Sequence, residues 1–117
     1  MSNFETLRIW QESREIVKEI YSIFEKHKDF SFKDQIQRAS ISIINNIAEG
    51  SESGTDNINI RYLQIAKGSC SEVKSMLYLT EDFGICSHEK AQELRDKVNG
   101  VILGIQKMIQ YYKSLKK

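Results

Sequence analysis

The C-terminal third of the chain carries an apolar pattern that is typical of a packed helix. From residue 91 onward the pattern alternates steps of three and four residues without a slip, at Ala91, Leu94, Val98, Val101, Ile105, Met108, Tyr112 and Leu115. Such spacing draws one narrow stripe along an α-helix and is characteristic of left-handed helical bundles. We therefore predict a long helix that follows an N-cap at Ser87 and packs against other helices.

Three further helices are predicted, separated by links rich in serine, glycine and aspartate. They span residues 5–28, residues 31–49 with Ser31 as N-cap, and a segment that begins at Thr55 or Asp56 and runs to about residue 83. Gly50 and Gly84 follow the second and third helices, as glycine often does at a helix end. The 117 residues thus predict one all-α domain, 1–117, folded as an antiparallel up-down-up-down four-helix bundle.

The first predicted helix has more apolar surface than a single core buries easily. One stripe holds Leu7, Trp10, Val17, Tyr21 and Phe24, and a second stripe about 120° away holds Ile9, Ile16, Ile20 and Ile23. We assign the first stripe to the core. The isoleucine stripe would expose a large apolar patch in a monomer, which favours self-association.

Two glycines in the last helix extend this prediction. Gly100 and Gly104 each lower helix propensity by about 1 kcal/mol relative to alanine, a cost best explained if another helix passes close to them. Together with the isoleucine stripe, they predict a subunit interface made of Ile9, Ile16, Ile20, Ile23, Gly100 and Gly104.

Polar residues also form arcs beside the apolar stripes of the second and third helices. The stripe that we single out contains Gln35, Asn45, Asn46, Glu49, Arg61 and Glu72. If the two arcs face each other, Arg38 and Glu72 would form a charge-assisted bond, and the asparagines would bind backbone groups. The alternative is that both arcs are solvated faces.

Several of these segments resemble a known family. They are residues 35–39 (QIQRA), Ser42 and Ile43, residues 46–50 (NIAEG), residues 61–63 (RYL) and residues 65–69 (IAKGS), with Phe4, Leu7, Trp10 and Gln11 near the start. The chain resembles the small four-helix bundle proteins encoded in intervening sequences of bacterial 23S ribosomal RNA genes. Such proteins are similar to the accessory variability protein of diversity-generating retroelements. The resemblance implies a ring-like homopentamer and, as partners, nucleic acid and a reverse transcriptase.

The charge of the chain is unevenly distributed, although its net value is only +1. Residues 1–58 contain seven Lys and Arg against ten Asp and Glu, whereas residues 59–117 contain ten against six. Assembly would gather the late lysines into a surface that holds phosphates. We therefore expect nucleic acid to bind Arg38, Lys107, Lys113, Lys116 and Lys117, with Tyr111 and Tyr112 available for stacking. Alternatively, the lysines complement the helix dipole and keep the end of the chain soluble.

No pattern of catalytic or metal-binding residues stands out. His27 and His88 lack ligands at metal-binding spacing, and Glu81 and Asp82 point about 100° apart on a helix. Neither GxxxxGK nor GxGxxG is present. We expect no catalysis, no metal and no cofactor.

The uncharged runs are too short for a membrane span, and Cys70 and Cys86 form no disulfide framework, so we expect a cytoplasmic protein with no membrane partner. The expected function is a non-catalytic homo-oligomer that binds nucleic acid through basic surfaces of the assembly. A structural scaffold or protein adaptor without nucleic-acid binding is the alternative.

Overall fold

The computed structural model describes residues 3–115. A short 3₁₀ helix, η1 (Phe4–Thr6), precedes four α-helices: α1 (Arg8–Ile23), α2 (Phe30–Ser51), α3 (Asp56–Asp82) and α4 (His88–Ser114). The described residues contain no strand, and the prediction of an all-α fold with four helices is confirmed.

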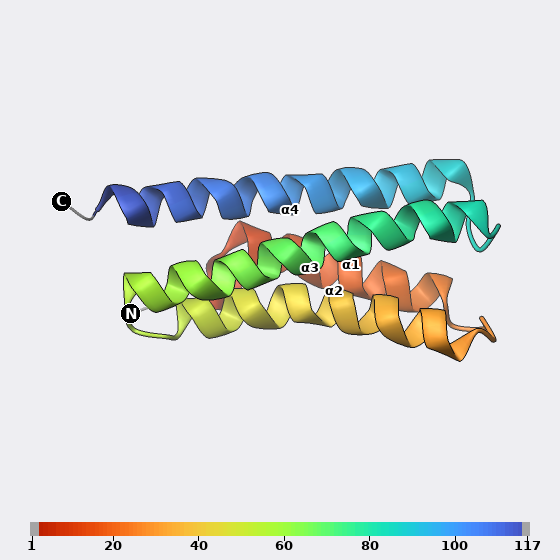
Figure 1. Ribbon diagram of the computed structural model, residues 1–117, viewed down its shortest axis with the longest axis horizontal. Helices are drawn as coiled ribbons and strands as arrows, with labels where there is room; N and C mark the ends of the chain where they lie inside the picture. The colour runs from red at the N-terminus through yellow and green to blue at the C-terminus, as the bar shows by residue number, and fades with distance from the viewer. Residues whose placement is uncertain (1–2, 116–117) are drawn as a thin grey trace.

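The four helices lie side by side along the long axis of a body that measures 50 × 21 × 20 Å (Figure 1). Each helix packs against two others: α2 contacts α1 and α3, and α4 contacts α3 and α1. The α1–α2 and α3–α4 links lie at one end of the body and the α2–α3 link at the other (Figure 1). Packing is most extensive between α2 and α3 and least extensive between α1 and α4.

Side-chain caps fix the starts of α3 and α4 where the sequence places them. Thr55 accepts a hydrogen bond from the backbone N–H of Ile58, and Ser87 accepts one from Lys90, as predicted. The cap of α2 is Asp29 and not Ser31, because the Asp29 carboxylate accepts from the backbone N–H of Phe32 at 3.1 Å. That earlier cap lets Ser31 and Phe32 lie inside the helix.

The two predicted terminal glycines behave differently. Gly84 has φ +71° and follows α3 as a left-handed residue, as predicted. Gly50 is instead a buried residue within α2, which continues to Ser51. A Cβ on Gly50 would lie 2.6 Å from Asn59 Oδ1 and 3.0 Å from Tyr62 Cβ, so a close approach by α3 accounts for the glycine here.

The core assignment of α1 was only partly correct: Phe24 is buried and Leu7 and Trp10 pack against the core as predicted, but the isoleucine stripe is buried as well. Ile9, Ile16 and Ile20 are 5%, 0% and 0% exposed and belong to the core, and Ile23 packs partly buried against it. Tyr21, which was assigned to the core, is 41% exposed. Because α2 and α4 both pack against α1, the isoleucine stripe is covered within a single chain. It therefore leaves no free patch for a subunit interface.

One of the two glycines of α4 leads to the same correction. A Cβ on Gly104 would overlap with Ile9 Cγ2, so the helix that passes close to it is α1 of the same chain. Gly100 is exposed, and a Cβ there would meet nothing within 4 Å. Gly104 is thus explained within a single chain, whereas the role predicted for Gly100 at a subunit interface stays a prediction.

The apolar stripe of α4 was predicted correctly from Ala91 to Ile105, after which Ile109 is buried while Met108 and Tyr112 are only half-buried. The sequence spacing also predicts a stripe along one side of α3, formed by Ile58, Tyr62, Ile65, Val73, Met76 and Thr80, and only its second half lies in the core. Val73, Met76 and Thr80 are buried, but Ile58 and Ile65 are 44% and 48% exposed. The first half of α3 turns a different set of residues to the core, namely Asn59, Ile60, Leu63, Ala66 and Cys70.

Candidate nucleic-acid interface

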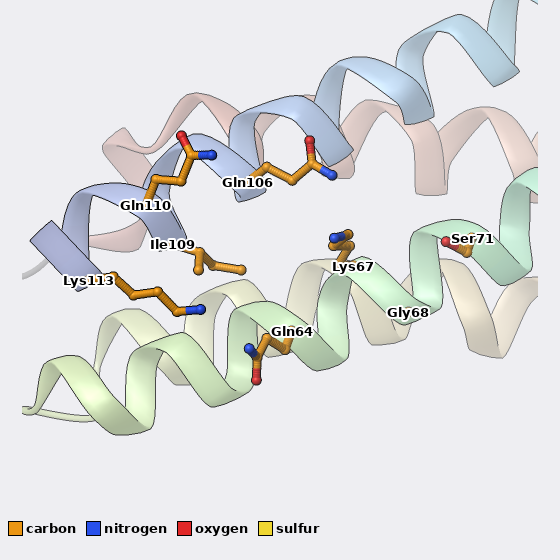
Figure 2. A pocket seen from close by; sticks show the side chains of 8 residues that line it. All are labelled: Gln64, Lys67, Gly68, Ser71, Gln106, Ile109, Gln110 and Lys113. Atoms are coloured by element: carbon orange, nitrogen blue, oxygen red, sulfur yellow. The ribbon is translucent and has the colours of Figure 1, made fainter.

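A polar groove runs between α3 and α4, with a cavity volume of about 660 Å³. It is lined by Gln64, Lys67, Gly68 and Ser71 of α3 and by Gln106, Ile109, Gln110 and Lys113 of α4. Figure 2 shows the Lys67, Ile109 and Lys113 side chains in the space between the two helices. No carboxylate lines this groove, so its fixed charge is positive.

Among the described residues, the two groove lysines have no acidic partner, unlike Lys18, Lys90 and Lys97. Within residues 3–115, neither Lys67 nor Lys113 has a carboxylate oxygen within 4.0 Å. Gly68 carries no side chain, which keeps the α3 wall low between Lys67 and Ser71. The arrangement therefore presents two free ammonium groups among neutral hydrogen-bonding groups, as an anionic ligand requires.

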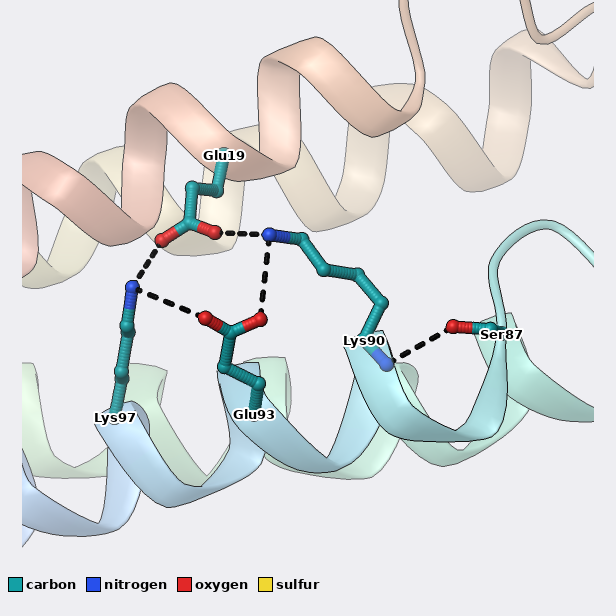
Figure 3. A network of polar contacts seen from close by, with 5 residues as sticks. All are labelled: Glu19, Ser87, Lys90, Glu93 and Lys97. Atoms are coloured by element: carbon teal, nitrogen blue, oxygen red, sulfur yellow. Dashed lines mark hydrogen bonds and ion pairs between the residues drawn. The ribbon is translucent and has the colours of Figure 1, made fainter.

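By contrast, two lysines at the other seam of α4, Lys90 and Lys97, are already engaged (Figure 3). The Glu19 carboxylate of α1 accepts from Lys90 and from Lys97, and Glu93 lies near both lysines. Burial raises the pKa of Glu19, but the bonds from Lys90 and Lys97 outweigh it and lower the pKa overall. This network joins α1 to α4 and leaves Lys90 and Lys97 little capacity for phosphate.

Of the basic residues predicted to bind nucleic acid, only Lys113 lines the groove. Lys107 lies six residues earlier on α4, about 120° around the helix, and lines a separate groove against α1. Lys116 and Lys117 lie outside the described residues. Arg38 donates to Asp34 at 2.7 Å on α2, a helix that contributes no residue to the groove.

The polar arcs of α2 and α3 do face each other, but Glu72 pairs with Gln35 and not with Arg38. Gln35 donates to Glu72 at 3.3 Å, and Ser42 and Ser69 share a hydrogen bond of 2.8 Å across the seam. The predicted bond between Arg38 and Glu72 is absent, because Arg38 turns to Asp34 one turn away on its own helix.

The two asparagines of the α2 arc differ, because Asn46 makes a hydrogen bond within α2 and Asn45 is exposed. Asn46 donates to the Ser42 carbonyl of its own helix at 2.8 Å, which agrees with the expected bond to a backbone group. Asn45, Glu49 and Arg61 are exposed. The seam between α2 and α3 is thus a short polar contact flanked by solvated side chains. The prediction of facing polar arcs holds for the contact, and the alternative of solvated faces holds for the exposed side chains beside it.

A buried arginine at the α3–α4 turn was missed by the sequence analysis. Arg95 is 2% exposed, donates to Glu81 and Gln92, and places its guanidinium 4.0 Å over the ring of Tyr78. Glu81 also binds His88 at 2.6 Å. Nothing in the spacing marks Arg95 as buried, because its partners Glu81 and Tyr78 come from α3 and depend on the register of the α3–α4 hairpin. Lys67 was missed for the same reason.

The cysteines show no sign of nucleophilic activation. Burial raises the pKa of the Cys70 thiol to about 12. Burial and the nearby charge of Glu81 raise the pKa of Cys86. Within residues 3–115, no three His, Cys, Asp or Glu side chains gather closely enough to hold a metal ion. None of the helices in that range combines the length and apolar character needed to cross a membrane.

Comparison with known proteins identifies the family. The sequence profile described as 23S rRNA-intervening sequence protein matches residues 5–110, which is most of the chain. The chain belongs to this family. The resemblance read from the NIAEG segment and its neighbours is therefore confirmed. The comparison with curated proteins found no match.

The fold of this 23S rRNA-intervening sequence protein is also found in a crystal structure. It is similar to a protein of unknown function from the S23 ribosomal protein family of Bacteroides thetaiotaomicron, with a TM-score of 0.80 and 22% sequence identity. The match covers 86% of this chain and 97% of that chain. At this level of identity, the likeness establishes the fold alone.

Proposed function

We propose that this protein is a non-catalytic homo-oligomer that binds nucleic acid, with the groove between α3 and α4 as the contact surface of each subunit. The observation that carries the proposal is the pair of lysines, Lys67 and Lys113, which line an acid-free groove without carboxylate partners. Phosphate groups are the natural partners of such lysines, and the binding is expected to weaken as salt rises.

Two lysines are few for one subunit, so the proposal depends on assembly. The family resemblance implies a pentameric ring of up-down bundles, which would bring ten of these lysines together. In that ring the groove of each subunit would face the same nucleic acid. The protein would act in the cytoplasm, and a reverse transcriptase is the further partner that the resemblance implies.

The self-association surface that we propose is an apolar stripe on α3 in place of the buried isoleucines of α1. Its members are Ile58, Ile65 and Leu79 of α3 together with Phe83, the residue that follows the helix, and they are 44%, 48%, 39% and 60% exposed. They lie within about 60° of one another on the helix. Aligned exposure of large apolar side chains is typical of an interaction surface.

A pair of charge-matched variants tests the nucleic-acid proposal. Lys67→Gln with Lys113→Gln should weaken retention of unrelated RNA and DNA sequences and flatten the salt dependence, because each lost lysine removes about one phosphate contact. Lys26→Gln with Lys28→Gln removes the same charge from the α1–α2 link and should change retention less. Equal losses in the two variants would overturn the assignment of the groove.

The alternative function is a structural scaffold or protein adaptor, and the exposed apolar stripe of α3 is the observation that favours it. Gel shifts of the wild-type protein at about 50 mM salt decide between the two, because phosphate contacts are strong under those conditions. Failure to shift both RNA and DNA would leave the scaffold as the better account.

A further inference from the structure

The groove between α3 and α4 offers two chemically distinct sets of groups. Lys67 and Lys113 supply positive charge. Gln64, Gln106, Gln110 and Ser71 supply neutral amides and a hydroxyl, each of which can both donate and accept hydrogen bonds. These four neutral side chains outnumber the two lysines of the groove. A site for phosphate alone would not require so many neutral hydrogen-bonding groups.

Aromatic rings are absent from the groove lining. Tyr78 lies on α3 but already has the Arg95 guanidinium 4.0 Å over its ring. Tyr111 is two residues from Lys113, about 160° around α4, and contacts Tyr112 edge-on. Proteins that hold single strands use aromatic side chains as platforms for unpaired bases. This groove is therefore suited to a nucleic acid whose bases are already stacked in a duplex.

The neutral groups of the groove match RNA better than DNA. An A-form RNA duplex presents 2′-hydroxyl groups in a wide, shallow minor groove that phosphates border. A 2′-hydroxyl both donates and accepts, which matches the glutamine amides and Ser71, while the phosphates match Lys67 and Lys113. We propose that the α3–α4 groove binds double-stranded RNA through its backbone and 2′-hydroxyl groups, without reading base sequence. This inference rests on the proposed nucleic-acid function.

The experiment compares three probes of about 16 nucleotides per strand, the length that a double-stranded RNA domain covers. They are an RNA duplex, a DNA duplex of the same sequence, and a single-stranded RNA that cannot pair, each measured by fluorescence anisotropy at equal salt. The RNA duplex should bind about tenfold more tightly than either of the others, the difference expected from a few hydrogen bonds. A second RNA duplex of unrelated sequence should bind as well as the first.

Two groove variants separate the roles of the two sets of groups. Gln64→Ala, Gln106→Ala and Gln110→Ala combined should bring the affinities for RNA and DNA duplexes together while leaving the salt dependence in place. Lys67→Gln with Lys113→Gln should weaken binding of both duplexes and flatten the salt dependence. Gln37→Ala on α2 is the matched control and should leave the RNA preference unchanged.

The outcomes distinguish this inference from the function on which it rests. If single-stranded RNA or the DNA duplex binds as tightly as the RNA duplex, the double-stranded RNA inference is overturned while nucleic-acid binding stands. If the triple glutamine variant keeps the full RNA preference, the groove is not what recognises the 2′-hydroxyls. If no probe binds at about 50 mM salt, the proposed function itself fails.

Discussion

At Gly50 the backbone of α2 lies close to α3. The other glycine of these two helices, Gly68, has no such neighbour. Asn59, the neighbour of Gly50, is buried, and the Asn59 Oδ1 atom has no hydrogen-bond partner among the described residues. A side chain at position 50 would have to displace this amide and the Asn59 carbonyl, which would lie 3.2 Å from the new Cβ.

Gly50→Ala should therefore lower the free energy of unfolding by about 1–3 kcal/mol, the cost typical of overpacking. Gly68→Ala is the matched control, because a Cβ at that exposed position meets nothing within 4 Å. It should raise the stability by up to about 1 kcal/mol through better helix propensity. Urea unfolding measures both changes, and a stabilising Gly50→Ala would refute the close approach.

Arg95 is the residue whose charge is most deeply buried. Its main ionic partner is Glu81, whose pKa is lowered chiefly by the bond from His88, against an opposing effect of burial and with further help from Arg95. A depressed native pKa means that the folded state binds protons less readily than the unfolded state. The Glu81 contribution is therefore present above the unfolded value of about 4.5 and is lost as the pH falls through the native value.

Glu81→Gln should accordingly destabilise the protein at pH 7 and reduce the loss of stability that wild type undergoes on acidification below about pH 5. Glu25→Gln removes an exposed carboxylate from the α1–α2 link and should leave the pH dependence nearly unchanged. Unfolding midpoints recorded from pH 7 to pH 3 test the pair. Parallel profiles for wild type and Glu81→Gln would argue against the ionic role of Glu81.

At the scale of elements, two kinds of polar interaction occur near the seam between α2 and α3: an exposed ion pair within α2 and hydrogen bonds that join the two helices. Arg38 and Asp34 form an exposed pair within one helix, whereas Ser42 bonds to Ser69 of the neighbouring helix and to Asn46. Exposed ion pairs contribute little, because water already solvates both charges. The seam is held by the hydroxyl contacts and by the packing beneath them.

Arg38→Ala should thus cost less than about 0.5 kcal/mol. Ser42→Ala should cost about 1 kcal/mol, because it removes a hydrogen bond between two helices. Both values come from urea unfolding at neutral pH. A loss near 2 kcal/mol for Arg38→Ala would instead support the buried pairing with Glu72 that the sequence suggested.

At the scale of the whole molecule, the exposed apolar stripe of α3 makes self-association the central expectation. Light scattering should give a mass well above the 13.6 kDa of one chain at micromolar concentration. Ile65→Lys with Leu79→Lys should return the mass to that of a monomer while circular dichroism stays helical. Leu103→Lys, at a 58% exposed position on α4, is the matched control and should leave the assembly intact. A monomeric wild type would rule out the assembly.

The sequence by itself determined the helices, most of their ends and the family. Spacing of three and four residues, the caps Thr55 and Ser87, and the left-handed Gly84 are local features, because each depends on residues within a turn or two of the chain. The NIAEG segment and the other short motifs indicated the family for a similar reason, because each motif is a local stretch of the sequence.

Only the tertiary structure decided which apolar stripe of α1 faces the core, that Gly104 receives Ile9, and that Lys67 shares a groove with Lys113. Each of these depends on the rotation of one helix about its axis and on its register against another helix. A helical wheel ranks the faces of one helix but contains no information on the neighbours that cover them. Burial in this bundle is a property of helix pairs, and the pairs are set by the packing of the whole chain.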